Sequence, residues 1–148
     1  MVADLRPEHV QSVVEALSSR FYLDAERMAD AIRRKASFNV IHLGTAAKVD
    51  IFVQRDDPWS LAEMSRRRPY AISEGLTFIL GSPEDIVLEK LRWFRVGGGM
   101  SDRQWDDVLG VLKVQRGKLD LDYLKRWASD LGLGDLLEKA VEDAGSRS

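Results

Sequence analysis

FNVIHLGTAAKVDIFV, residues 38–53, is where the hydrophobic pattern of the chain changes its period. Residues 38–43 are rich in apolar side chains, residues 44–47 can form a turn, and residues 48–53 alternate strictly. We therefore expect a β-hairpin. Side chains two residues apart on a strand share a face, so Val49, Ile51 and Val53 lie on one face and Lys48, Asp50 and Phe52 on the other. The pattern places a carboxylate, that of Asp50, in the middle of a strand beside an aromatic ring.

Two helices are expected before the hairpin. Pro7 suits a first helical turn, and apolar residues follow it at helical spacing to about residue 20. Asp24 can cap a second helix that runs to Lys35 and ends in three basic residues, which favour a helix C-terminus. These are the helices that we expect to flank the sheet.

The chain changes character after the hairpin. A helix is expected from Pro58 to about residue 68, and Pro69 ends it. The runs 70–72 and 77–80 favour β-structure and are separated by Ser73-Glu74-Gly75, which predicts a second hairpin or a pair of strands. Ser82-Pro83-Glu84-Asp85 then has the capping hydroxyl, the first-turn proline and the acidic residues of a helix start.

The last third of the chain is expected to be helical. Helical periodicity and capping residues predict helices over about 101–114, 120–131 and 135–144, and the glycines at 97–99 predict a flexible connection. The predicted fold class is α+β: a small mixed or antiparallel sheet with flanking helices, followed by a C-terminal helical lobe. We expect one domain, residues 1–148, with an α/β lobe over 1–81 and a helical lobe over 82–144.

Composition excludes several classes of protein. The 148 residues are 45% apolar and 31% charged with a formal net charge of −2, so the chain has no basic excess that would drive nonspecific nucleic-acid binding. It has no cysteine, which excludes disulfides, thiol catalysis and thiolate zinc sites. No apolar run approaches the roughly 20 residues of a membrane span, and the first residues do not form a signal peptide. We expect a cytoplasmic protein with no membrane partner.

The order and spacing of several short segments carry a resemblance to a known family. These segments are FNVI (38–41), KVDIF (48–52), SPED (82–85) leading to Lys90-Leu91, DDV (106–108) and LDLDYL (119–124). Together they resemble the nucleotidyltransferase superfamily, in particular bacterial minimal nucleotidyltransferase-like proteins, some of them related to toxin–antitoxin systems. The resemblance extends over nearly the whole chain.

The resemblance implies magnesium and a nucleoside triphosphate as cofactors. In this family a Gly-Ser turn holds the nucleotide phosphates, two acids at i and i+2 on the next strand bind magnesium, and a later strand adds a third carboxylate. Magnesium neutralises phosphate charge and aligns the attacking hydroxyl with the departing pyrophosphate. Asp50 matches the third carboxylate, as a catalytic residue and metal ligand.

The main catalytic motif of the family has no counterpart in these residues. The strand with the paired acids should run directly into residues 2–7, but neither the acid pair nor the Gly-Ser turn occurs at a fitting position, and Asp4 is followed at i+2 by Arg6. We therefore expect an N-terminally shortened nucleotidyltransferase-like protein that is not catalytically competent alone. Asp50 would have a catalytic role only with an upstream acid pair. It is also a candidate magnesium ligand, and the alternative is a solvated or salt-bridged strand carboxylate.

Other charged residues have two open interpretations each. Lys90 could reach a nucleotide phosphate, or extend its alkyl chain along the helix to water. Arg66, Arg67 and Arg68 could bind nucleotide or RNA phosphates, with Tyr70 available for stacking, or they could be a basic helix end. Glu84 and Asp85 could be catalytic or could be helix caps.

A non-enzymatic function is the alternative. A sheet that lacks its first strands leaves edge groups and apolar surface available for pairing, which predicts a protein-interaction module, either antitoxin-like or part of a homo-oligomer. Such a module would form a dimer or a heterocomplex. RNA binding through residues 66–68 is a third hypothesis, and it predicts an affinity that falls with salt.

Overall fold

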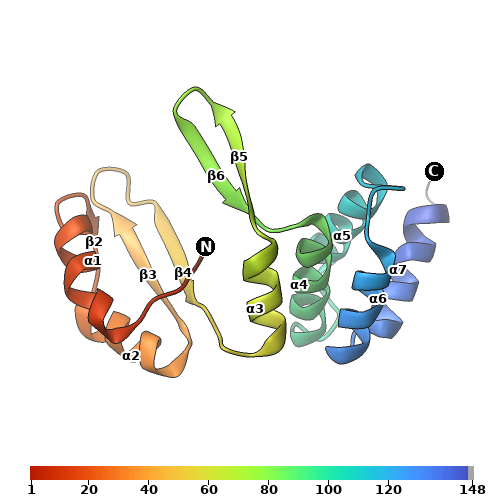
Figure 1. The fold of residues 1–148 in the computed structure, drawn as a ribbon, viewed down its shortest axis with the longest axis horizontal. Coiled ribbons are helices and arrows are strands. Elements are labelled where there is room, and N and C mark those ends of the chain that lie inside the picture. The colour runs from red at the N-terminus through yellow and green to blue at the C-terminus, as the bar shows by residue number, and fades with distance from the viewer. Residues whose placement is uncertain (147–148) are drawn as a thin grey trace. The chain divides into compact units, whose positions relative to one another are not determined.

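The computed structural model describes residues 1–146 and confirms the α+β class (Figure 1). The described residues form seven α-helices and two small sheets. Their contacts divide the chain into two compact units, Met1–Leu61 (unit 1) and Ala62–Ser148 (unit 2). Each described helix is too short or too polar to cross a membrane.

Unit 1 is built on a four-stranded mixed sheet. Its strands are β1 (Val2–Ala3), β2 (Phe21–Tyr22), β3 (Ser37–His42) and β4 (Lys48–Val53), in the spatial order β1-β4-β3-β2. The expected hairpin is present as the antiparallel pair β3 and β4, and β1 adds to β4 in parallel. The two-residue strands β1 and β2 were not predicted, because two residues are too few to show alternation.

Helices cover one face of this sheet. They are η1 (Pro7–His9), α1 (Val10–Leu17) and α2 (Ala25–Arg34), and Asp24 caps α2 by accepting from the backbone N–H groups of Glu26 and Arg27. Met28 and Ile32 of α2 pack with buried side chains of β3 and β4, among them Phe38, Val40, Ile51 and Val53. As the alternation predicted, Ile51 and Val53 share one face of the strand, and that face points into the core.

Unit 2 begins within α3 (Pro58–Arg66) and continues into a hairpin of β5 (Arg68–Ser73) and β6 (Leu76–Leu80). Gly75 in its turn has φ 76°, a conformation that favours glycine. The expected lobe boundary lay after residue 81, whereas the contacts of the chain place the hairpin with the helices of unit 2. Every residue of the two strands is exposed.

Four helices form the body of unit 2: α4 (Pro83–Val96), α5 (Asp102–Val114), α6 (Leu121–Asp130) and α7 (Gly134–Ser146). Helix α4 contacts α5 and α6, and α7 contacts α5 and α6. Ser82, Ser101 and Asp120 cap α4, α5 and α6, as their positions in the sequence predicted. Each helix contributes side chains to the core; the fully buried ones include Val87, Leu88, Leu91, Val108, Leu124 and Ala128.

Candidate functional site

Asp50 lies on the side of the unit 1 sheet that faces away from the core. It stands in the middle of β4, directly opposite Asn39 of β3, and its side chain is 56% exposed. Lys48, two residues earlier on the same face, places its Nζ 3.3 Å from Asp50 Oδ1. The carboxylate therefore has one cationic neighbour and an amide across the strand pair.

Further exposed side chains surround Asp50 on this face. Residues that pair directly across two strands point to the same side of a sheet. Phe52 pairs with Ser37, and Tyr22 of β2 pairs with Ile41, whose other neighbour is Lys48. We name this surface the open sheet face; its residues are Tyr22, Ser37, Asn39, Lys48, Asp50 and Phe52. It combines a carboxylate, an amine, an amide and a hydroxyl with two aromatic rings.

The first residues of the chain lie next to Asp50. The N-terminal ammonium group donates to the Asp50 carbonyl oxygen at 2.9 Å. The Phe52 N–H donates to the Met1 carbonyl at 2.8 Å, and the Gln54 N–H to the Ala3 carbonyl at 2.9 Å. The strand that opens the chain is thus the direct neighbour of the strand that carries Asp50.

The oxygen ligands near Asp50 make up only part of a magnesium site. Within residues 1–146 no three histidine, cysteine, aspartate or glutamate side chains are grouped so that they could hold a metal ion. Asp50 provides one carboxylate, and Asn39 is the nearest residue across the strand pair with an amide oxygen. Magnesium often combines one or two carboxylates with waters and substrate phosphates. The Asp50 carboxylate and the Asn39 amide therefore fit a magnesium ion that arrives bound to a phosphate. They do not fit a magnesium ion held by protein ligands alone.

A hollow beside the open sheet face contains cationic residues that the sequence indicated only as the end of a helix. It is lined by Tyr22, Asn39 and residues of α2 that include Arg33 and Arg34. Both guanidinium groups pair with Asp30, at 3.1 and 3.7 Å. The approach of these residues to Asn39 depends on how α2 packs against β3, and in the sequence Arg33 and Arg34 resemble an ordinary basic helix end. The single carboxylate of Asp30 offsets one of their two positive charges.

The arginine cluster of residues 66–68 is engaged within unit 2. Arg66 at the end of α3 places Nη2 2.8 Å from Glu84 Oε2 and Nε 3.5 Å from Asp85 Oδ2. Arg67 pairs with Glu63 at 2.8 Å. Arg68 donates to the backbone carbonyls of residues 65 and 67. The structure thus directs the three side chains to three different sets of partners and does not gather them into one phosphate-binding cluster.

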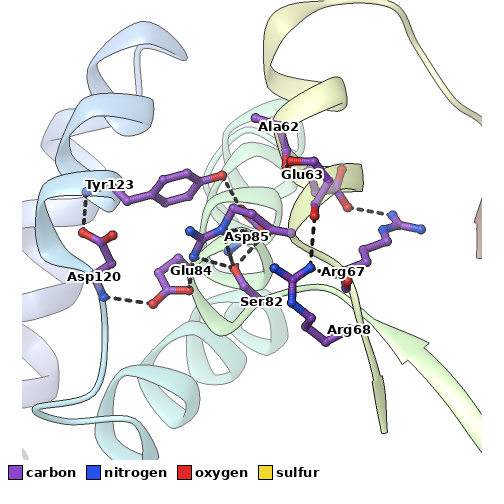
Figure 2. A network of polar contacts seen from close by, with 11 residues as sticks. Ala62, Glu63, Arg67, Arg68, Ser82, Glu84, Asp85, Asp120 and Tyr123 are labelled. Carbon is purple, nitrogen blue, oxygen red and sulfur yellow. Dashed lines mark hydrogen bonds and ion pairs between the residues drawn. The ribbon is translucent and has the colours of Figure 1, made fainter.

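Glu84 and Asp85 are the centre of a buried polar network (Figure 2). The residues are 6% and 2% exposed. Asp85 accepts hydrogen bonds from the Tyr123 hydroxyl at 2.7 Å and from the Ser82 hydroxyl at 2.7 Å. Glu84 accepts from the backbone N–H of Asp120 at 2.9 Å. With Arg66 included, every carboxylate oxygen of the pair has a donor.

The electrostatics of the network follow from these contacts. Burial raises the pKa of Glu84, but the hydrogen bond from the Asp120 N–H, the other hydrogen bonds and the charge of Arg66 outweigh burial and hold that pKa below its ordinary value. Burial, the hydrogen bond to Asp85 and the charge of Asp85 raise the pKa of Tyr123. The Arg66 guanidinium carbon lies 3.9 Å from the centre of the Tyr123 ring, a cation–π contact.

This network joins three segments of unit 2. Ser82, Glu84 and Asp85 begin α4, Asp120 and Tyr123 begin α6, and Arg66 ends α3. The sequence indicated the caps, Ser82 and Asp120, but not their connection, which requires residues 36 positions apart to meet. Since both carboxylates are buried and fully hydrogen-bonded, the geometry gives them a structural role in addition to helix capping.

Lys90 connects α4 to α5. Its Nζ lies 2.6 Å from Asp107 Oδ2 and 3.3 Å from Gln104 Oε1. The hydrogen bond from Lys90, and then its charge, lower the pKa of Asp107. Lys90 belongs to unit 2 and Asp50 to unit 1.

In comparisons with known proteins, no family model, no curated protein and no solved structure matches the chain.

Proposed function

We propose that the chain is a nucleotidyltransferase-like protein that binds a magnesium–nucleotide complex at the open sheet face and does not catalyse transfer by itself. The observation that carries the proposal is the position of Asp50, exposed in mid-strand opposite Asn39 and beside Lys48. Asp50 would contact the magnesium ion, and the Lys48 ammonium group would contact a phosphate oxygen. Tyr22 and Phe52 offer exposed rings on the same face.

The neighbour of Asp50 supports the same proposal. In the family that the sequence resembles, the paired acids stand on the strand that leads into the segment corresponding to residues 2–7. Here β1 is hydrogen-bonded to β4, the strand of Asp50. The segment that the resemblance associates with the acid pair and the candidate third carboxylate are therefore side by side.

The absence of catalysis follows from the ligand count. Transfer of a nucleotidyl group needs metal ions that hold both the nucleotide phosphates and the attacking hydroxyl. A single exposed carboxylate binds magnesium weakly without phosphate. We therefore expect the chain to bind nucleoside triphosphate with magnesium and to release no pyrophosphate.

Titration calorimetry with each nucleoside triphosphate, with and without magnesium, tests this proposal. Asp50→Asn should weaken binding when magnesium is present, because the ion loses its carboxylate ligand. Without magnesium the same variant should bind equally or more tightly, because a negative charge near the phosphates is gone. Asp130→Asn, which changes an exposed acid of unit 2, is the control and should behave as the parent protein does.

Two results would contradict the proposal in different ways. If no nucleoside triphosphate binds to the parent protein, or if Asp50→Asn and Asp130→Asn behave alike, the open sheet face is not the site. If a pyrophosphate assay detects turnover that Asp50→Asn abolishes, the chain catalyses transfer on its own, and the proposed lack of catalysis is wrong.

A further inference from the structure

The β5–β6 hairpin has more exposed large apolar residues than any helix of unit 2 that the structure describes. Its strands pair with each other, and every residue in them is exposed. Six of these residues are large and apolar: Tyr70, Ile72, Leu76, Phe78, Ile79 and Leu80. An isolated two-stranded hairpin is marginally stable in water, and additional strands or a packed face are the usual remedy.

The pairing register gathers most of this surface on one side. Tyr70 pairs with Phe78, and Leu76 and Leu80 lie two residues from Phe78 on the same strand, so the four side chains share one face. We name this set the apolar hairpin face. On the opposite face, Ile79 pairs with Pro69 and Thr77 with Ala71, while Ile72 lies at the β-bulge between Ala71 and Ser73, outside the regular alternation. The hairpin is amphipathic in the way of a strand pair that packs on a second layer.

We propose that the apolar hairpin face packs against the same face of a second copy of this chain, with the two hairpins antiparallel about a two-fold axis. A two-fold interface uses one patch twice, so the patch must be complementary to itself. Tyr70 and Phe78, which are 49% and 50% exposed, lie at the centre of the face and would stack on their counterparts. The leucines on either side would fill the rest of the layer.

The charges at the two ends of the hairpin favour this arrangement. Arg68 begins β5 at the base of the hairpin, and Glu74 lies in the turn at its tip. In an antiparallel pair the base of one hairpin meets the tip of the other, so Arg68 would approach Glu74 of the second copy at both ends. A parallel pair would bring like charges together. The charge pattern therefore selects a second copy, in one orientation, as the occupant.

The available area is sufficient for a weak dimer. Fully exposed side chains of this size present about 200 Å² each, and the four residues of the face are about half exposed, which corresponds to about 400 Å² per copy. The total of about 800 Å² lies below the roughly 1,000 Å² of a stable specific interface and falls in the range of weak, transient contacts. We expect a dimer that forms with increasing concentration and dissociates on dilution.

Sedimentation equilibrium of the full chain over a range of concentrations tests the inference. The mass should rise from 16.7 kDa towards twice that value. Phe78→Ser should keep the protein monomeric at every concentration. Ile79→Ser, which removes a more exposed side chain from the opposite face of the same strand, should leave the dimer intact.

A charge exchange gives a second test that does not depend on the stability of the apolar face. Arg68→Glu and Glu74→Arg should each weaken the dimer at low salt, because each places like charges together, and the double variant should restore it. The inference fails if the parent protein remains a monomer, even one that binds a different protein. It also fails if Ile79→Ser dissociates the dimer as strongly as Phe78→Ser, or if the double variant does not recover. Nucleotide binding at the open sheet face is independent of each of these results.

Discussion

Arg66 is the residue on which the unit 2 network depends most. It is the cation nearest to two carboxylates that are almost completely buried. Removing the partner of a buried charge costs more than the ion pair contributes, because the remaining charge stays in a site with little solvation. Glu84 and Asp85 would retain their other donors, which moderates the loss without replacing the positive charge.

We predict that Arg66→Ala lowers the free energy of unfolding by about 2–4 kcal/mol, somewhat less than for a fully buried pair because Arg66 is partly exposed. Arg68→Ala is the control, since the exposed Arg68 donates to the backbone carbonyls of residues 65 and 67, and it should change stability by no more than about 0.5 kcal/mol. Urea unfolding at low protein concentration, followed by circular dichroism, measures both. Equal losses would mean that residues 66–68 act as a uniform basic helix end.

Glu84 should make stability depend on pH in acid. Its pKa in the folded protein lies below the ordinary value, because its hydrogen bonds and Arg66 outweigh burial. The unfolded chain then binds the proton of this carboxyl more readily than the folded one. The stability that ionised Glu84 contributes is therefore fully present above the pKa of an unfolded glutamate, about 4.3. This contribution is lost as the pH falls through the lower pKa of Glu84 in the folded state.

Glu84→Gln should therefore be less stable than the parent at pH 7 and should lose less additional stability on acidification. Urea midpoints at pH values between neutral and about 3, below the glutamate range, check this. Glu138→Gln, an exposed glutamate of α7, provides the comparison and should retain the acid dependence of the parent. If the Glu84 and Glu138 variants show the same dependence, the network does not hold Glu84 in its charged form.

At the scale of single residues, the sequence predicted what local pattern can show. Asp50 was expected on the face of its strand opposite Ile51 and Val53, and that is where it lies. Asn39 was not identified as its neighbour, because cross-strand pairing depends on the register set by residues 43–47. Tyr123 was missed as a partner of Asp85 because two segments far apart in the chain determine that contact.

At the scale of elements, periodicity and capping were informative wherever an element is long. The hairpin β3–β4 and the capped helices α2, α4, α5 and α6 have their expected positions because each signal is local. Strands β1 and β2 exist through their pairing with β4 and β3, and two residues contain no period. A strand defined mainly by its partner cannot be predicted from its own residues.

The β5–β6 hairpin shows a different limit at this scale. Its residues favour strands, and the sequence predicted two runs in approximately these positions. Alternation normally indicates which face of a strand is buried. Here the structure leaves both faces exposed within the chain, and the apolar side chains that would ordinarily mark a core mark a surface instead. Sequence pattern alone does not distinguish the two cases.

At the scale of the whole molecule, two compact units imply two centres of stability. Unit 1 has a core in which α2 packs on β3 and β4, with Met28 fully buried. Unit 2 has a helical core in which Leu91 of α4 is also fully buried. Cooperative opening follows groups of residues that share buried contacts. A cavity in one core should therefore be sensed mainly by the amides of its own unit.

Met28→Ala and Leu91→Ala form a matched pair for this prediction, since each removes a side chain of similar size from a fully buried site. Each should cost about 2–5 kcal/mol in the unit that contains it. Hydrogen exchange of Met28→Ala should accelerate in β3 and β4, with α4 and α5 retaining the protection of the parent, and Leu91→Ala should give the reverse. If either variant accelerates exchange in both units to the same extent, the chain unfolds as a single cooperative body, and the division after Leu61 describes contacts and not stability.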